Sequence, residues 1–259
     1  MNFTYKQPGR LLSVLLTGLV LALPWGQANA QHDIRGINGT PGATAEDPVT
    51  FNLYAFPFNI NLPEGSSLQM WGFGDQDAGA GATHAEGAGY NLPQYPGPTL
   101  VVTEDVPVTI NLTNSGVPSP VSIVVTGQEV TSSCTTSVTP VAAPDCAGLV
   151  TEAAEVGEEV QYTFTPTEPG TYIYHSLDGS NPGLLVEMGL LGVLIVRPDP
   201  ATNTGRNAYG DGTGTDYEQE FLSLLTEVDP ETVSYTHLRA HETVLVISYA
   251  VFCLKRGGG

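Results

Sequence analysis

Histidine and cysteine are the residues of this chain best suited to bind a transition metal, and it has only five histidines and three cysteines. His237 and His241 stand four residues apart, a spacing that presents two imidazoles on one helix face to a single ion. Leu238 follows the first of them, where the zinc-protease motif has a glutamate that acts as general base. The pair therefore matches the spacing of a zinc site without its acid-base residue.

The segment around these two histidines has a simpler explanation at the level of DNA. Residues 233–243 and 247–254 can be encoded by sequences that resemble the adapters of short-read sequencing libraries. We predict that residues 233–259 are an artefactual, adapter-derived tail and that the natural chain is cut at about Thr232. His237, His241 and Cys253 are therefore left out of every site prediction.

The other end of the chain has the pattern of a secretory signal peptide. Lys6 and Arg10 precede an apolar run, and the sequence Ala-Asn-Ala at 28–30 offers a small-residue cleavage site. The apolar run is too short and wrongly flanked for a membrane span. We predict a signal peptide at residues 1–30 and a secreted or periplasmic protein with no membrane attachment after cleavage; a retained N-terminal anchor is the alternative.

The charge of the chain restricts which partners it can bind, and its cysteines indicate their own redox state. The chain has 27 acidic and 8 basic residues, a net charge of −19. Such a surface repels nucleic acid and anionic membranes, so no nucleic-acid partner is predicted. In an exported chain, Cys134 and Cys146 predict a disulfide, and two free thiols or metal ligands are the alternatives.

Short strands dominate the sequence between residues 48 and 200. Val106, Val108, Ile110 and Leu112 alternate with more polar positions, the period-two pattern of a half-buried strand. Other short runs in this region are apolar or alternate in the same way, and segments rich in Gly, Pro, Ser and Asp separate them. Seven or more short strands with such turns predict an all-β domain, a Greek-key antiparallel β-sandwich.

The composition changes on both sides of this domain. Residues 31–47 are predicted to be an N-terminal extension. Residues 201–216 are polar and rich in glycine, as linkers between domains are. An apolar pattern resumes at residues 217–232, which predicts the start of a truncated second domain.

Four runs in this domain carry a family resemblance. The sequences YPGPTL at 95–100, VTINLTN at 108–114, GTYIYHS at 170–176 and MGLLGVLIVRP at 188–198 resemble, in order and spacing, the first plastocyanin-like (cupredoxin) domain of the multicopper oxidase and copper nitrite reductase superfamily. The resemblance covers residues 48–200, and residues 217–232 are similar to the opening of the second cupredoxin domain. It implies a copper-dependent oxidoreductase as the parent, with the missing second domain as partner and either a homo-oligomer or a monomer with further domains.

Most ligand positions that this resemblance implies hold other residues. Val-Val-Thr-Gly at 124–127 stands where the oxidases have His-x-His-Gly, and Tyr-His-Ser-Leu at 174–177 stands where they have Tyr-His-Ser-His. In the nitrite reductase pattern Ser176 takes the position of the copper thiolate, which a hydroxyl cannot replace. His175 is the retained ligand. It is predicted either to ligate an interdomain copper or to hydrogen-bond a backbone carbonyl as a structural histidine.

Three further residues have a metal-binding interpretation beside a plainer one. Met188 is either an axial copper ligand or, as we favour, a core residue. His84 lies in a Gly/Ala-rich loop with several carboxylates, which is either a metal site or a solvated loop. His32, next to the predicted cleavage site, could bind copper adventitiously through its imidazole and the new N-terminus.

Together these features predict the N-terminal cupredoxin domain of an exported multicopper-oxidase-like copper oxidoreductase. The domain itself lacks a complete copper site, gives at most His175 to an interdomain copper, holds no catalytic residue and is expected to show no turnover alone. The alternative is a copper-free extracellular β-sandwich that acts as a structural or binding module. A His-Cys-His run with a downstream His and Met beyond residue 232 would favour the enzyme.

Overall fold

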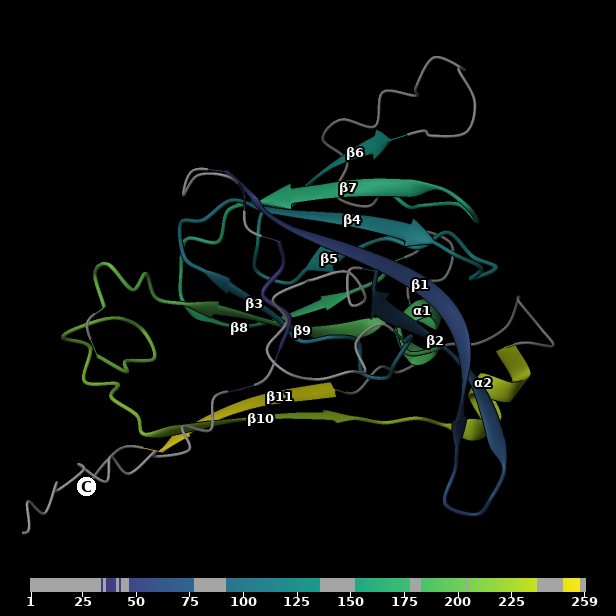
Figure 1. The fold of residues 1–259 in the computed structure, drawn as a ribbon. Coiled ribbons are helices and arrows are strands. Elements are labelled where there is room, and N and C mark those ends of the chain that lie inside the picture. The colour runs from purple at the N-terminus through teal and green to yellow at the C-terminus, as the bar shows by residue number, and fades with distance from the viewer. Residues whose placement is uncertain are drawn as a thin grey trace, which may run out of the picture. The chain divides into compact units, whose positions relative to one another are not determined.

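The computed structural model describes residues 34, 36–40, 42, 47–76, 92–135, 152–177, 183–203, 205–236 and 249–256. The chain divides into two compact units, residues 1–31 and residues 32–259, and every described residue belongs to the second unit. Secondary structure in this unit is nearly all strand (Figure 1). No helix in the described part of the chain combines the length and hydropathy needed to cross a membrane.

Two sheets form a β-sandwich around one hydrophobic core. The five-stranded sheet has the order β2-β1-β4-β7-β6, from strands β1 (Val49–Asn61), β2 (Ser67–Asp75), β4 (Val108–Asn114), β6 (Thr131–Thr135) and β7 (Glu159–Phe164). The four-stranded sheet has the order β3-β9-β8-β5, from strands β3 (Leu100–Thr103), β5 (Val124–Val125), β8 (Gly170–His175) and β9 (Leu191–Arg197). The predicted all-β sandwich is confirmed.

The strand directions correct one part of that prediction. β1 pairs with β4 in parallel, and so does β3 with β9, so the sheets are mixed and a purely antiparallel sandwich is wrong. The chain passes through β2 and then β3 of the other sheet before it returns as β4, which is the long crossover that a parallel pair needs. Alternating hydrophobicity predicts which face of a strand is buried, but it carries no information about direction.

The period-two pattern of β4 is confirmed. Val108, Ile110 and Leu112 are buried in the core, while Asn111 and Thr113 lie half-exposed on the opposite face. Each strand of the five-stranded sheet next to β4 repeats this arrangement over the paired residues. The sheet therefore has an apolar inner face and a polar outer face.

Several elements have no clear signal in the sequence. β6, with the sequence TSSCT, has no apolar alternation, and α1 (Leu184–Glu187) is a single turn before β9. Ile37, in the predicted extension, is only 1% exposed. Its N–H donates to the Thr99 carbonyl and its own carbonyl accepts from Val101, so this residue extends the edge of β3.

The segment after the sandwich forms β10 (Gln219–Thr226), α2 (Pro230–Thr236) and β11 (Tyr249–Arg256), with β10 and β11 paired antiparallel. Arg197 of β9 forms an ion pair with the buried Glu220 of β10. Val233, on α2, is fully buried in the core cluster although it falls at the first position of the predicted tail. The linker, the second domain and the adapter-derived tail remain predictions.

Asn114, at the end of β4, organises the turn that follows. Its Nδ2 donates to the carbonyls of Val117, Ser119 and Ala154 at 3.0–3.1 Å. Its Oδ1 accepts from the N–H groups of Gly116 and Val117 at 3.2 and 2.9 Å. The side chain is fully buried, so these bonds satisfy backbone groups that have no water to bind.

Replacing Asn114 by Asp tests this role. The carboxylate would face three carbonyl oxygens in the core, so Asn114→Asp should lower the free energy of unfolding by about 3 kcal/mol. Asn59→Asp, on an exposed position of β1, is the control and should change it by less than about 0.5 kcal/mol. Urea denaturation of both variants measures the difference, and equal stability of the two would refute the role of Asn114.

Candidate functional site

His175 is the last residue of β8 and lies between two neighbouring strands. Its backbone is opposite Val124 of β5 on one side and Leu191 of β9 on the other. The side chain is half-buried, and its Nδ1 lies 3.1 Å from the carbonyl oxygen of Ser176. When Nδ1 carries the proton and donates to this carbonyl, Nε2 has the lone pair that a metal would bind. The contact suits both a structural histidine and an oriented ligand.

Ser176, the next residue, is fully buried in a network with Ser122. Its Oγ accepts from the N–H of Ser122 at 2.9 Å. The Oγ of Ser122 in turn donates to the Leu177 carbonyl at 2.7 Å and accepts from the Leu177 N–H at 3.0 Å. Two hydroxyl groups thus connect the segment before β5 with the end of β8 at the position where the resemblance implies a copper thiolate.

Tyr174, the residue before His175, points the opposite way into the core. It is fully buried, and its hydroxyl donates to the Pro98 carbonyl. Its ring lies against Phe73, with ring centroids 5.6 Å apart. Burial raises the pKa of Tyr174 well above its usual value, so the phenol stays neutral and acts as a donor.

Two glycines make room for the Tyr174 side chain. A Cβ at Gly192 would lie 2.3 Å from the ring, and a Cβ at Gly97 would lie 2.8 Å from the hydroxyl oxygen. Gly97 also donates its N–H to the Leu191 carbonyl at 2.8 Å. The YPGPTL and GTYIYHS runs, which carried the resemblance, are therefore in direct contact, and this contact fixes the strand end that bears His175.

The other positions implied by the resemblance do not supply copper ligands. Val124, directly opposite His175, is aliphatic, and Thr126 donates its backbone N–H to Ile173. Met188 is fully buried in the core cluster, as the core interpretation predicts. Within the described ranges, no group of three or more His, Cys, Asp or Glu residues lies close enough to hold a metal ion. By their chemistry, the residues around His175 do not fit a complete copper centre.

Several predicted site residues fall outside the described residues. These are His32, His84, Cys146, His237 and His241, together with the side chains of Cys134 and Cys253. The disulfide between Cys134 and Cys146 therefore stays a prediction, as does each interpretation of the Gly/Ala-rich loop.

One acidic group in α1 has no signal in the sequence. The backbone N–H of Asp229 donates to Oε1 of Glu187 at 3.4 Å, so the two acids lie side by side. Partial burial raises the pKa of Glu187, and the charges of Asp229 and Glu227 add to the effect. These acids are some 40 positions apart in sequence, and no spacing signal links them.

Comparison with known proteins addresses the identity of this domain. Residues 76–201 match the family described as Multicopper oxidase. This range is a cupredoxin-like domain of the multicopper oxidase superfamily. YPGPTL and GTYIYHS, two of the runs that carried the resemblance, both lie inside the matched range. No curated protein matches the chain.

Solved structures similar to this chain come from three bacteria. A copper nitrite reductase from Nitrosomonas europaea has 22% identity and a TM-score of 0.42, over 60% of this chain and 43% of its own. A multi-copper oxidase from Pseudomonas thermotolerans has 20% identity and a TM-score of 0.41, over 62% and 32%. A multicopper oxidase from Campylobacter jejuni, titled a metallo-oxidase, has 19% identity and a TM-score of 0.43, over 66% and 31%. The chain thus spans less than half the length of each.

The glycine beneath Tyr174 gives a first test of this site. Gly192→Ala should lower the free energy of unfolding by about 2 kcal/mol, because the added methyl overlaps the aromatic ring. It should also shift the NMR signals of the His175 imidazole, since β8 must move. Gly170→Ala, whose added Cβ would lie 3.3 Å from the Tyr172 ring, is the control and should cost less. A Gly192→Ala protein as stable as the control would contradict the packing described.

The raised pKa of Glu187 predicts a pH effect of definite sign. An acid whose pKa is higher in the folded state favours folding when protonated, so this contribution is lost as the pH rises from the ordinary pKa of about 4.5 through the folded value. Glu187→Gln should therefore match the unchanged protein near pH 4 and exceed its stability at pH 7.

Chemical denaturation at the two pH values measures the effect of Glu187→Gln. Glu64→Gln is the control, because the Ser66 hydroxyl lowers the pKa of this exposed acid, and it should give no gain at pH 7. A Glu187→Gln protein that is less stable at pH 7 would show that the carboxylate is stabilising there.

Proposed function

We propose that this chain is the N-terminal cupredoxin domain of an exported multicopper-oxidase-like copper oxidoreductase. The observation that carries the proposal is the placement of His175. The histidine ends β8 beside the Ser122–Ser176 network, with its Nδ1 at a backbone carbonyl, inside the range that matches the multicopper oxidase family. An imidazole fixed through Nδ1 in this way is prepared to ligate through Nε2.

In this proposal His175 is one ligand of a copper shared between domains. The other imidazoles, and the thiolate of an electron-transfer copper, come from the second cupredoxin domain that begins near residue 217. Copper bound there supplies one-electron chemistry. The residues of this chain hold one ligand and the domain interface, and no catalytic residue, so turnover belongs to the parent protein.

The names of the similar structures support copper in the parent, since they are a copper nitrite reductase and two multicopper oxidases. Export is supported by the predicted signal peptide and by the two cysteines of the mature chain. A secreted or periplasmic location and a homo-oligomer of the parent follow as parts of the same proposal.

A second candidate function has a specific observation in its favour. Val124 and Ser176 occupy ligand positions of the family pattern, and Ser176 is engaged in a buried hydrogen bond that needs no metal. A cupredoxin fold that is stable in this way can serve as a copper-free extracellular structural or binding module. The two candidates differ in the copper content of the full protein.

Copper analysis of the full gene product tests the proposal. The protein should contain copper, and His175→Ala should lose about one copper per chain while the thiolate-bound copper and its visible absorption remain. His84→Ala, in the Gly/Ala-rich loop and outside the proposed interdomain site, is the matched control and should lose none. The chain described above should by itself bind less than one copper.

Two results would overturn the copper role. A full-length protein without copper would favour the structural or binding module. A His175→Ala protein with unchanged copper would leave the enzyme possible and remove His175 from its site.

A further inference from the structure

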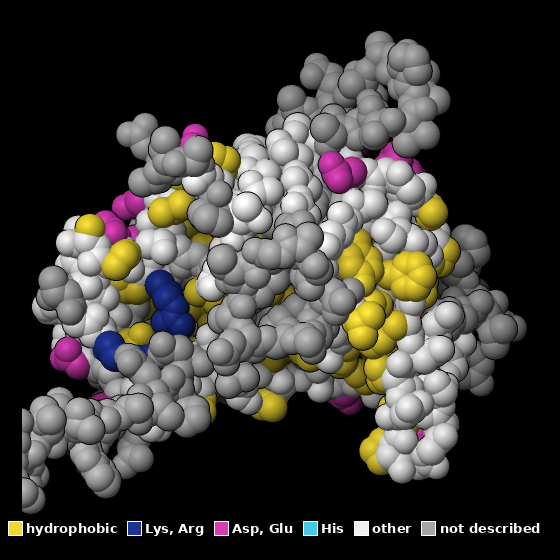
Figure 2. Space-filling model, in the orientation of Figure 1, with side chains coloured by type: hydrophobic (Ala, Val, Ile, Leu, Met, Phe, Trp, Pro, Cys, Tyr) yellow, Lys and Arg dark blue, Asp and Glu magenta, His cyan; other side chains and the backbone are white. Residues whose placement is uncertain are grey.

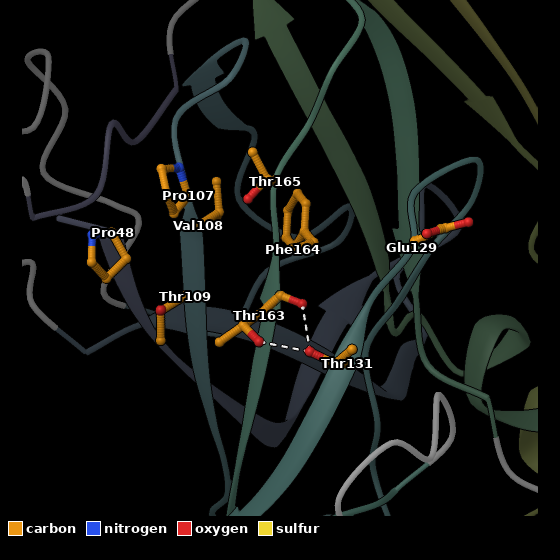
Figure 3. Close-up of a pocket in the computed structure, with 9 residues that line it drawn as sticks. All are labelled: Pro48, Pro107, Val108, Thr109, Glu129, Thr131, Thr163, Phe164 and Thr165. Carbon is orange, nitrogen blue, oxygen red and sulfur yellow. Dashed lines mark hydrogen bonds between the residues drawn. The ribbon is translucent and has the colours of Figure 1, made fainter. Parts of the chain in front are cut away.

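The outer face of the five-stranded sheet carries two ordered rows of uncharged polar side chains. Thr50, Thr109, Thr163 and Thr131 are aligned by backbone pairing across β1, β4, β7 and β6. The Oγ1 atoms of Thr131 and Thr163 are 2.8 Å apart. Figure 3 shows Thr109, Thr163 and Thr131 side by side on their strands, in a groove of about 370 Å³ with Pro48 at one side and Glu129 at the other.

The second row consists mainly of side-chain amides. Asn52, Asn111, Gln161 and Ser133 are paired in the same order, two residues away from the threonine on each strand. Gln161 donates to Asn111 at 3.0 Å, and Asn111 donates to Asn52 at 2.7 Å. Each amide has two N–H donors, and the row uses one from Gln161 and one from Asn111. Planar donors and acceptors are thus held at strand spacing, about 4.8 Å apart.

An apolar groove continues this face along β1. It has a volume of about 540 Å³ and is lined by Tyr54, Phe56, Pro57, Phe58, Leu92 and Pro93. Phe56 is 44% exposed and Leu92 is 63% exposed, which is unusual for such large apolar side chains. Figure 2 shows hydrophobic side chains gathered on the surface over β1 and β2.

Glycines of β2 form the floor of this groove. A Cβ at Gly74 would lie 2.7 Å from the Tyr54 ring, and a Cβ at Gly72 would lie 2.7 Å from the Phe58 ring. The rings therefore lie against the strand where it has no side chains, instead of standing away from it. This produces a broad aromatic surface beside the amide row.

The charge of the face restricts its ligand. The eight positions of the two rows carry no charge in a chain with 27 acidic residues, and the six residues that line the apolar groove carry none either. Glu129 lines the threonine groove, and Glu159 lies in the row after the amides, where it accepts a hydrogen bond from Thr113. Among the described residues, no cluster of three or more His, Cys, Asp or Glu side chains could hold a cation, and an anion is repelled by the net charge of −19.

We propose that this face binds a neutral polysaccharide. A sugar ring has an apolar face of C–H groups that packs on an aromatic ring, and a rim of hydroxyls that donate and accept hydrogen bonds as amides and threonines do. From Thr50 to Phe58 the strand rises about 27 Å, enough for several sugar units. The site is separate from His175 and is independent of the copper proposal.

Native gel electrophoresis of the chain in gels that contain hydroxyethyl cellulose, xylan or dextran tests this. At least one of these neutral polymers should retard the protein, and anionic polygalacturonate should not. Phe56→Ala and Gln161→Glu should each weaken binding tenfold or more, because the first removes the stacking surface and the second disrupts the amide row. Tyr209→Ala, which removes an exposed aromatic ring from the loop before β10, is the matched control and should bind normally.

Thermal unfolding confirms that each variant is folded before binding is compared. Absence of retardation in all three polymers would overturn the proposal. Full binding by Gln161→Glu would also overturn it, because the polymer would then be held by the apolar groove alone. A dimer in light scattering that Phe56→Ala dissociates would instead identify the face as a contact between two copies of the chain.

Discussion

The hydrogen bond from the Tyr174 hydroxyl to the Pro98 carbonyl is the interaction on which this end of the sandwich depends. Both groups are in the core, where an unpaired hydroxyl or carbonyl would cost about 1–3 kcal/mol. Because Gly97 and Gly192 leave space for the ring, β8 approaches the loop before β3 closely enough for the bond to form. In a strand, successive side chains alternate, so burial of Tyr174 places His175 on the other face.

Hydrogen bonds between protein groups hold this end of the sandwich together. The Ser122 N–H donates to the Ser176 hydroxyl, and the Ser122 hydroxyl donates to the Leu177 carbonyl. Val124, opposite His175, has no polar side-chain group that needs a partner. The fold can therefore be kept while ligand positions change, and a single histidine can remain available to another domain. This arrangement is compatible with the proposal that His175 alone serves a copper shared with another domain.

The sequence predicts those features that arise from local pattern. Alternation shows that Val108, Ile110 and Leu112 face the core, and the number of short strands separated by turn residues indicates the sandwich before any contact is known. The direction of β1 relative to β4 is set by the crossover between sheets, which alternation does not encode. The Tyr174–Pro98 contact joins residues 76 positions apart, and its dependence on Gly192 is a matter of packing. The burial of Ile37 could not be predicted, because a single apolar residue shows no periodic pattern.

For the site, sequence identifies His175 but not what surrounds it. Ser122 is a polar residue within the apolar run VSIVV, a weak sign that it has a buried partner, yet nothing in the spacing points to Ser176. The threonine and amide rows follow from the register of four strands, and a single strand shows only alternating polar positions. Registry is a property of the assembled sheet, which is why these rows became visible only in three dimensions.

The most direct test of the central claim is the sequence of the source gene beyond codon 232, obtained from genomic DNA with primers inside the region for residues 48–200. The account predicts that codons 233–259 are replaced by a second cupredoxin domain with a cysteine, histidines and a methionine as copper ligands. A gene that ends soon after Pro230, or continues without those ligands, would contradict the assignment to a copper oxidoreductase.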